Sequence, residues 1–181
     1  YGGAHSGSLE MSSRAIHNGA DDNASGVAGM LELASKLSVE RKSLQRSIIF
    51  VAFNAEEQGI FGSKYFVQNS PVNPSNIITM INLDMIGRLK NLSLNISGTG
   101  TSTVFNKILD KASAKHYLNI SKNPEGFGPS DHSSFYSNDI PVLFFFTGGH
   151  PDYHKPSDDW EKINSKGQMK IIYMIYDIIL E

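Results

Sequence analysis

The sequence predicts an α/β fold with three layers, in which helices cover both faces of a central mixed, largely parallel sheet. Short, β-branched apolar runs recur along the chain, as is typical of strands buried on both faces. Segments with helical spacing of apolar residues separate them, and this alternation favours a parallel sheet. The 181 residues contain no repeat and no linker that would divide them, so we expect one domain over residues 1–181.

Four segments are expected to form strands. The apolar runs lie at 46–54 (RSIIFVAFN), 76–87 (NIITMINLDMIG) and 140–149 (IPVLFFFTGG), and the alternating segment lies at 91–98 (NLSLNISG). The second of these runs places the end of its strand near Asp84.

Four other segments have apolar residues at helical spacing: 25–37, 59–69, 102–116 and 167–180. Asn23 or Asp22 is the expected N-cap of the first helix, because their side-chain oxygens can accept first-turn N–H groups. Residues 1–20 are rich in Gly and Ser and are expected to form a loop.

Composition limits the possible partners and ligands. The net charge of −2 gives no reason to expect nucleic acid or an anionic membrane surface, and no apolar run approaches the ~20 residues of a membrane span. The absence of cysteine leaves His, Asp and Glu as metal ligands.

Polar side chains follow the predicted strands, where α/β sheets form their sites. Carboxylates and histidines from five segments are therefore expected to converge at one edge: Asp22, Glu56, Glu57, Asp84, Asp131, His132, His150 and His154. Taken singly, several have ordinary explanations. Asp22 can be an N-cap, Glu56 and Glu57 can favour a helix dipole, and His154 can be a surface residue.

Convergence changes this interpretation, because clustered carboxylates repel one another unless a cation neutralises them. Asp84 ends an apolar run, and a buried carboxylate there needs a partner. Zinc suits a mixed imidazole and carboxylate site, whereas calcium and magnesium prefer oxygen ligands alone.

Five motifs resemble, in order, those of the di-zinc aminopeptidases of clan MH. They are GADDNASGVAGMLELA, FVAFNAEEQGIFGSKYF, INLDMIGR, PSDHSSFYSNDIPVLFFFTG and DYHKPSDDWEKIN. The resemblance extends over nearly the whole chain and implies the zinc-exopeptidase fold.

The resemblance also implies roles for individual residues. Asp22 resembles the carboxylate that bridges two zinc ions, and the Asp22–Asn23 peptide is expected to be cis. Glu57 resembles a ligand of one zinc, and Asp84 and His154 resemble ligands of the other. Glu56 resembles the general base, which takes a proton from the attacking water.

A complete site of this family needs one more histidine, in a His-x-Asp strand motif. His5 resembles it superficially, but no apolar strand precedes it and position 7 is Gly. We therefore expect the ligand and its N-terminal strands to lie upstream of Tyr1, in a segment absent from this chain. His17 is a weaker substitute, expected instead to be an exposed loop residue.

Phe127, Ser130, Asp131 and Tyr153 are expected to contact the metal ligands or the substrate. Phe127 occupies a position near which some relatives have a tyrosine that stabilises the oxyanion, and phenylalanine cannot donate that bond. Ser130 or Asp131 can orient metal ligands, or simply cap the helix before HSSFY. Phe127 and Tyr153 can line a substrate pocket or pack in the core.

The favoured function is a zinc-dependent aminopeptidase acting on peptides. A glutaminyl cyclase or carboxypeptidase relative, and an inactive binding domain of the same fold, are the alternatives. Without the additional histidine, this chain is expected to bind a single zinc ion or to be partly occupied. By resemblance to exported bacterial enzymes, a periplasmic or secreted location is expected.

Overall fold

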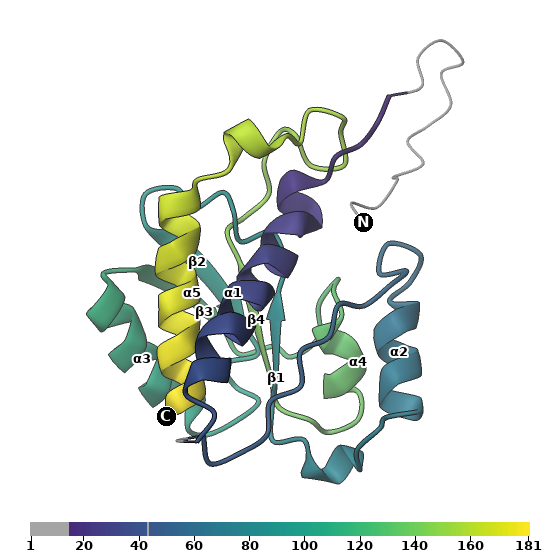
Figure 1. The fold of residues 1–181 in the computed structure, drawn as a ribbon, viewed down its shortest axis with the longest axis vertical. Helices are drawn as coiled ribbons and strands as arrows, with labels where there is room; N and C mark the ends of the chain where they lie inside the picture. Colours follow the sequence, from purple (N-terminus) through teal and green to yellow (C-terminus); the bar gives the residue numbers. More distant parts are fainter. Residues whose placement is uncertain (1–14, 43) are drawn as a thin grey trace.

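A four-stranded sheet with the order β1-β4-β2-β3 lies at the centre of the computed structural model, which describes residues 15–42 and 44–181 (Figure 1). Strand β1 (Met80–Leu83) runs parallel to β4 (Val142–Phe146). Strand β2 (Ser93–Ser97) runs parallel to β3 (Asn119–Asn123) and antiparallel to β4. The sheet is therefore mixed, as the sequence predicts.

Helices cover both faces of this sheet, which confirms the three-layer architecture (Figure 1). One face packs against α1 (Gly26–Val39), α3 (Phe105–His116) and α5 (Ser165–Leu180). The other packs against α2 (Phe61–Gln68) and α4 (His132–Tyr136). The described residues also form three short helical turns: η1 (Ala20–Ser25), η2 (Pro74–Asn76) and η3 (Trp160–Lys162). Within the described residues, no helix combines the length and apolar character that a membrane crossing requires.

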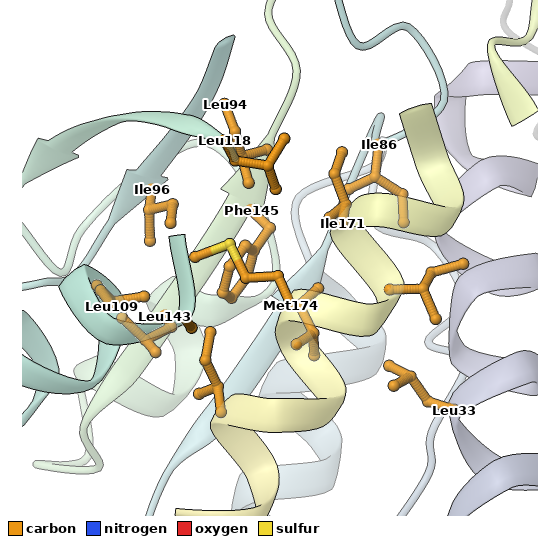
Figure 2. Close-up of a cluster of buried hydrophobic side chains, with 14 of the residues drawn as sticks. Leu33, Ile86, Leu94, Ile96, Leu109, Leu118, Leu143, Phe145, Ile171 and Met174 are labelled. Carbon is orange, nitrogen blue, oxygen red and sulfur yellow. The ribbon is translucent and has the colours of Figure 1, made fainter. Parts of the chain in front are cut away.

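Strand β4 shows why its sequence is a continuous apolar run. Leu143 and Phe145 point into the core beneath α1, α3 and α5, where Leu94 and Leu109 also lie (Figure 2). Val142, one position along, belongs to the smaller core beneath α2 and α4. Successive residues face opposite sides of a strand, so β4, which is covered on both sides, is apolar throughout.

The structure differs from the sequence prediction in two segments. Residues 46–54 are not a strand, because they join no ladder within the described residues, and Ile49 and Phe50 remain 47% and 38% exposed. The apolar pattern predicts burial, but a strand also needs a neighbour for its backbone hydrogen bonds. Strand β3 was not predicted, since the sequence NISKN contains a single apolar residue, Ile120.

The parallel pairing of β1 and β4 brings two functional segments to the same edge. The ladder continues beyond both strands, because the Asp84 N–H donates to Phe145 O and the Thr147 N–H donates to Met85 O. Asp84 and the loop that follows β4 therefore lie side by side, and this loop contains His150 and His154.

Candidate metal centre

Three predicted ligands come together in a single cluster. The nearest donor atoms of Asp22, Glu57 and His154 all lie within 4.8 Å of one another. His154 Nε2 is 3.2 Å from Asp22 Oδ2 and 3.4 Å from Glu57 Oε2. Asp22 is buried, whereas the side chains of Glu57 and His154 are 37% and 39% exposed, so the cluster opens to solvent on one side.

The Asp22 side chain is held by the turn η1, directly before α1. The Asp22–Asn23 peptide is cis, as the resemblance implies. Asn23 fastens this turn to the end of β1: its amide Nδ2 donates to Leu83 O (2.9 Å), and its Oδ1 accepts the N–H of Met85 (3.1 Å). The same oxygen accepts the Gly26 N–H at 3.0 Å, so Asn23 also acts as the predicted cap of α1.

Gly26 lets the helix approach the strand. A Cβ at this position would lie 2.3 Å from Leu83 O, closer than any side chain tolerates. The start of α1, and Asp22 with it, can therefore lie directly against the end of β1.

Asp84 lies at the end of β1 but is not part of the three-residue cluster. Ser130 Oγ donates to Asp84 Oδ2 at 2.7 Å and accepts a hydrogen bond from Asn82 Nδ2 at 2.7 Å. This chain orients the Asp84 carboxylate, and Ser130 thus contacts a predicted ligand as expected. Asp84 remains close enough to Asp22 and Glu57 for their charges to raise its pKa.

The site has the electrostatics of a carboxylate cluster. Burial, reinforced by the charges of Asp84 and Glu57, raises the pKa of Glu56 to about 8. Burial also raises the pKa of Asp22 to about 6, with Glu57 adding to the effect, and raises that of Asp84 to about 6. These carboxylates lower one another's tendency to ionise, and a nearby cation would reverse the effect.

The backbone is strained at three places around the site. Ala55, Met85 and His154 have φ values of 56°, 55° and 56°, in the left-handed region that side chains disfavour. Ala55 directly precedes Glu56, and Met85 directly follows Asp84. Such strain is typical of functional sites, where surrounding structure holds side chains in fixed directions.

The remaining predicted residues lie around this centre. Tyr153 stacks on the ring of His154, with centroids 3.7 Å apart, and burial and the neighbouring carboxylates raise its pKa to about 12. Phe127 is 56% exposed and packs edge-on against Tyr136, so it is not a core residue. Asp131 is the N-cap residue directly before α4, but its side chain makes no capping hydrogen bond. Burial raises its pKa, and its charge is among those acting on Glu56.

Of the two candidates for the additional histidine, only His17 lies within the described residues, and it is not part of the cluster. His5 lies outside the described residues. His17 lies in a loop, but it is partly buried rather than exposed as expected.

The sequence assigned no role to several residues that organise the site. Asp158 accepts the backbone N–H groups of Asp21 and Asp22 and pairs with Arg88. His150 Nε2 lies 3.1 Å from Asp21 Oδ2. These contacts join segments far apart in the chain, and the only available signal was that Asp158 and His150 are polar residues in the loop after β4.

Comparisons with known proteins agree with this fold. The family model described as Peptidase family M28 matches residues 2–179. Leupeptin-inactivating enzyme 1 of Streptomyces exfoliatus is 33% identical over 153 residues, 80% of this chain and 32% of that protein. The aminopeptidase from Aneurinibacillus sp. strain AM-1 superposes with a TM-score of 0.73 at 29% identity, over 90% of this chain and 39% of that one.

The Legionella pneumophila LapA aminopeptidase shares the fold, with a TM-score of 0.80 at 22% identity over 93% of this chain and 47% of that one. The chain thus spans less than half the length of each of these proteins. The match of a single family model from one end to the other confirms the resemblance seen in the motifs: the chain belongs to peptidase family M28.

Proposed function

We propose that this chain contains most of the active site of a zinc-dependent aminopeptidase, which hydrolyses the N-terminal peptide bond of peptides. The main support is the cluster of Asp22, Glu57 and His154 beside a carboxyl group, Glu56, whose pKa is raised to about 8. The similar proteins include enzymes described as aminopeptidases.

The residues present fit zinc. The cluster combines one imidazole with two carboxylates, a donor set that zinc accepts. Burial and, to a smaller extent, the charges of neighbouring carboxylates raise the pKa values of Asp22 and Asp84, and a divalent cation would favour their ionised forms. Asp22, Glu57, Asp84 and His154 are the proposed ligands. When bound, a zinc pair supplies Lewis acidity, which activates water and polarises the scissile carbonyl.

Glu56 is the proposed general base. Without metal, the pKa of Glu56 is about 8 and the carboxyl group is protonated near neutral pH. The positive charge of bound zinc would lower this pKa, so that the carboxylate could accept a proton from water and later return it to the leaving amine. Glu56 is separated from the ligand Glu57 by a single peptide bond, so the two adjacent side chains divide proton transfer and metal binding between them. The solvent-exposed side of Glu57 and His154 leaves room for a peptide to approach.

Three finer features complete the proposal. Two zinc ions would be held here, and Asp22 would be the ligand that they share, since a short carboxylate suits a two-metal site. A segment upstream of Tyr1 supplies the remaining histidine, in agreement with the longer relatives. The location is extracytoplasmic, a proposal that rests on family resemblance alone and that fractionation of expressing cells would test.

The proposed base is tested by Glu56→Gln, in protein extended to include the upstream segment of its own gene. We expect turnover of amino-acid p-nitroanilides to fall by about 10²–10⁴-fold, the usual contribution of general acid–base catalysis. Zinc content should stay close to two ions per chain, because Glu56 is not a proposed ligand. A Glu56→Gln enzyme with full activity would exclude this mechanism.

Two controls make the assay specific. Glu32→Gln changes an exposed glutamate on α1 and should leave turnover unchanged. Parallel assays with N-terminal glutamine peptides and with C-terminally blocked and free peptides separate aminopeptidase activity from glutaminyl cyclase and carboxypeptidase activity. Absence of all three activities, with zinc bound, would instead favour a binding domain.

A further inference from the structure

A single buried carboxylate connects the segments that hold the proposed ligands. Asp158 is 1% exposed, and its Oδ2 accepts the backbone N–H groups of Asp21 (2.8 Å) and Asp22 (3.0 Å). Its Oδ1 accepts a hydrogen bond from Arg88 Nη2 at 2.8 Å. We propose that Asp158 and Arg88 form a positioning pair, which fixes the Asp22 turn for zinc binding; this inference rests on the proposed zinc function.

The contacts of Asp158 fix the direction of the Asp22 backbone. Both N–H groups belong to the turn η1, and one carboxylate oxygen with two lone pairs accepts both. The backbone carbonyl of Asp158 also accepts the Ala20 N–H, at 3.0 Å. Three successive residues of the turn are thus held by one residue of the loop that contains His154.

Arg88 extends this link to the third ligand segment. It follows Asp84 in the chain, beyond the end of β1, and its guanidinium reaches across to the His154 loop. There it contacts Asp158 and, at 3.4 Å, Asp152 Oδ2, so its two partners lie on either side of His154 in the sequence. Asp158 and Arg88 therefore join the turn of Asp22, the segment of Asp84 and the loop of His154.

The negative charge of Asp158 indicates that its contact with Arg88 contributes to the positioning of the turn. Asp158 lies close enough to Asp21 and Asp22 to raise the pKa of both carboxyl groups. A neutral acceptor would satisfy the same N–H groups without this repulsion. The carboxylate is needed for the charge-assisted bond to the guanidinium, and that bond is what couples the three segments.

The experiment compares zinc affinity among folded variants, by competition with a chromophoric chelator, alongside thermal unfolding without metal. Asp158→Asn keeps the size of the side chain but removes its charge, and an amide cannot accept both N–H groups and pair with Arg88. We expect zinc binding about 10–100-fold weaker, the usual effect of losing a group that orients a ligand. Arg88→Lys keeps the positive charge but not the guanidinium geometry, so its zinc binding should weaken by more than twofold and by up to about tenfold.

The matched control is Asp177→Asn. Asp177 forms an ion pair with Lys115 at 2.8 Å on the surface between α3 and α5, away from the site. Asp177→Asn should bind zinc within twofold of the affinity of the unsubstituted chain, and its thermal stability should be lower. A merely structural Asp158 would behave in the same way.

Asp22→Asn distinguishes a failure of the proposed zinc site from a failure of the proposed positioning role of Asp158 and Arg88. If this change weakens zinc binding but Asp158→Asn and Arg88→Lys bind zinc as the unsubstituted chain does, the positioning role is wrong and the zinc site stands. If Asp22→Asn itself leaves zinc affinity unchanged, the proposed function fails. If Asp158→Asn does not fold, Arg88→Lys decides: zinc affinity equal to that of Asp177→Asn would overturn the inference.

Discussion

The core beneath α1, α3 and α5 and the polar edge beyond β1 and β4 differ in what their residues contribute. In the core, side chains such as Leu94, Ile96 and Phe145 are completely buried among apolar neighbours. At the edge, buried carboxyl groups face one another and their pKa values rise. Stability comes from the first region, and it allows the second to keep electrostatically unfavourable groups in place.

Asp21 and Asp22, which are adjacent in the chain, also differ in whether they support the structure or face the site. Asp21 is fully buried, and its Oδ1 accepts the N–H of Gly87 (2.7 Å) and the hydroxyl of Ser25 (2.9 Å). Its Oδ2 faces His150. Asp22 instead directs Oδ2 toward His154 and the open side of the cluster. Asp21 therefore braces the turn, and Asp22 presents its carboxylate to the site.

The largest expected effect on stability comes from a cavity in the core. Leu109 of α3 is completely buried, and Leu109→Ala should lower the free energy of unfolding by about 3–5 kcal/mol in urea denaturation. Val104→Ala, at a residue 53% exposed just before the same helix, should change it by less than about 1 kcal/mol. Equal effects at the two positions would contradict the assignment of the core.

A pH-dependent effect on stability should come from the carboxylates of the edge. In the folded, metal-free protein, burial and mutual repulsion hold the pKa of Glu56 near 8 and those of Asp22 and Asp84 near 6. The unfolded chain releases these protons at lower pH, near 4. Between about pH 4 and 8 the folded state therefore binds more protons, and the free energy of unfolding should fall as pH rises.

This dependence is measured by denaturation at a series of pH values in the presence of a chelator. Glu56→Gln should remove the part of the decrease that lies between pH 6 and 8, because the amide does not titrate. A free energy of unfolding that rises over this range would show that the carboxylates are not clustered as described.

The smallest effect is expected on the surface. Asp110 pairs with Lys122 at 2.6 Å, but its side chain is 68% exposed. Solvent screens such a pair, and Asp110→Asn should change the free energy of unfolding by less than about 1 kcal/mol. A larger loss would mean that α3 and β3 depend on this contact.

Sequence patterns predicted the parts of the fold in which burial alone decides the structure. The apolar runs identified β1 and β4, and helical spacing identified α1 and α5. The prediction of a strand at 46–54 was wrong, because strand formation also needs a hydrogen-bonding neighbour, which an apolar pattern does not specify. Strand β3 was missed because one face of the strand is polar and Ile120 is the single apolar residue on the other face.

The residues of the site also divide into those that the sequence predicted and those that it could not predict. Motif order predicted Asp22, Glu57 and His154, and the structure places them together. Asp84 was predicted as a ligand but lies outside this cluster. The links through Asp158 and Arg88 could not be predicted, since Asp158 lies 136 residues from Asp22 and 70 from Arg88 along the chain. Such contacts depend on folded geometry rather than on local sequence.

The most direct test of a zinc site at the polar edge is the stability of the chain at pH 8 with and without zinc. A ligand present at 100 times its dissociation constant should raise the free energy of unfolding by about 2.7 kcal/mol. We predict this increase for the unsubstituted protein and its loss in Asp22→Ala, which removes the carboxylate at the centre of the cluster. Equal stabilisation of both proteins, or none in either, would contradict the account.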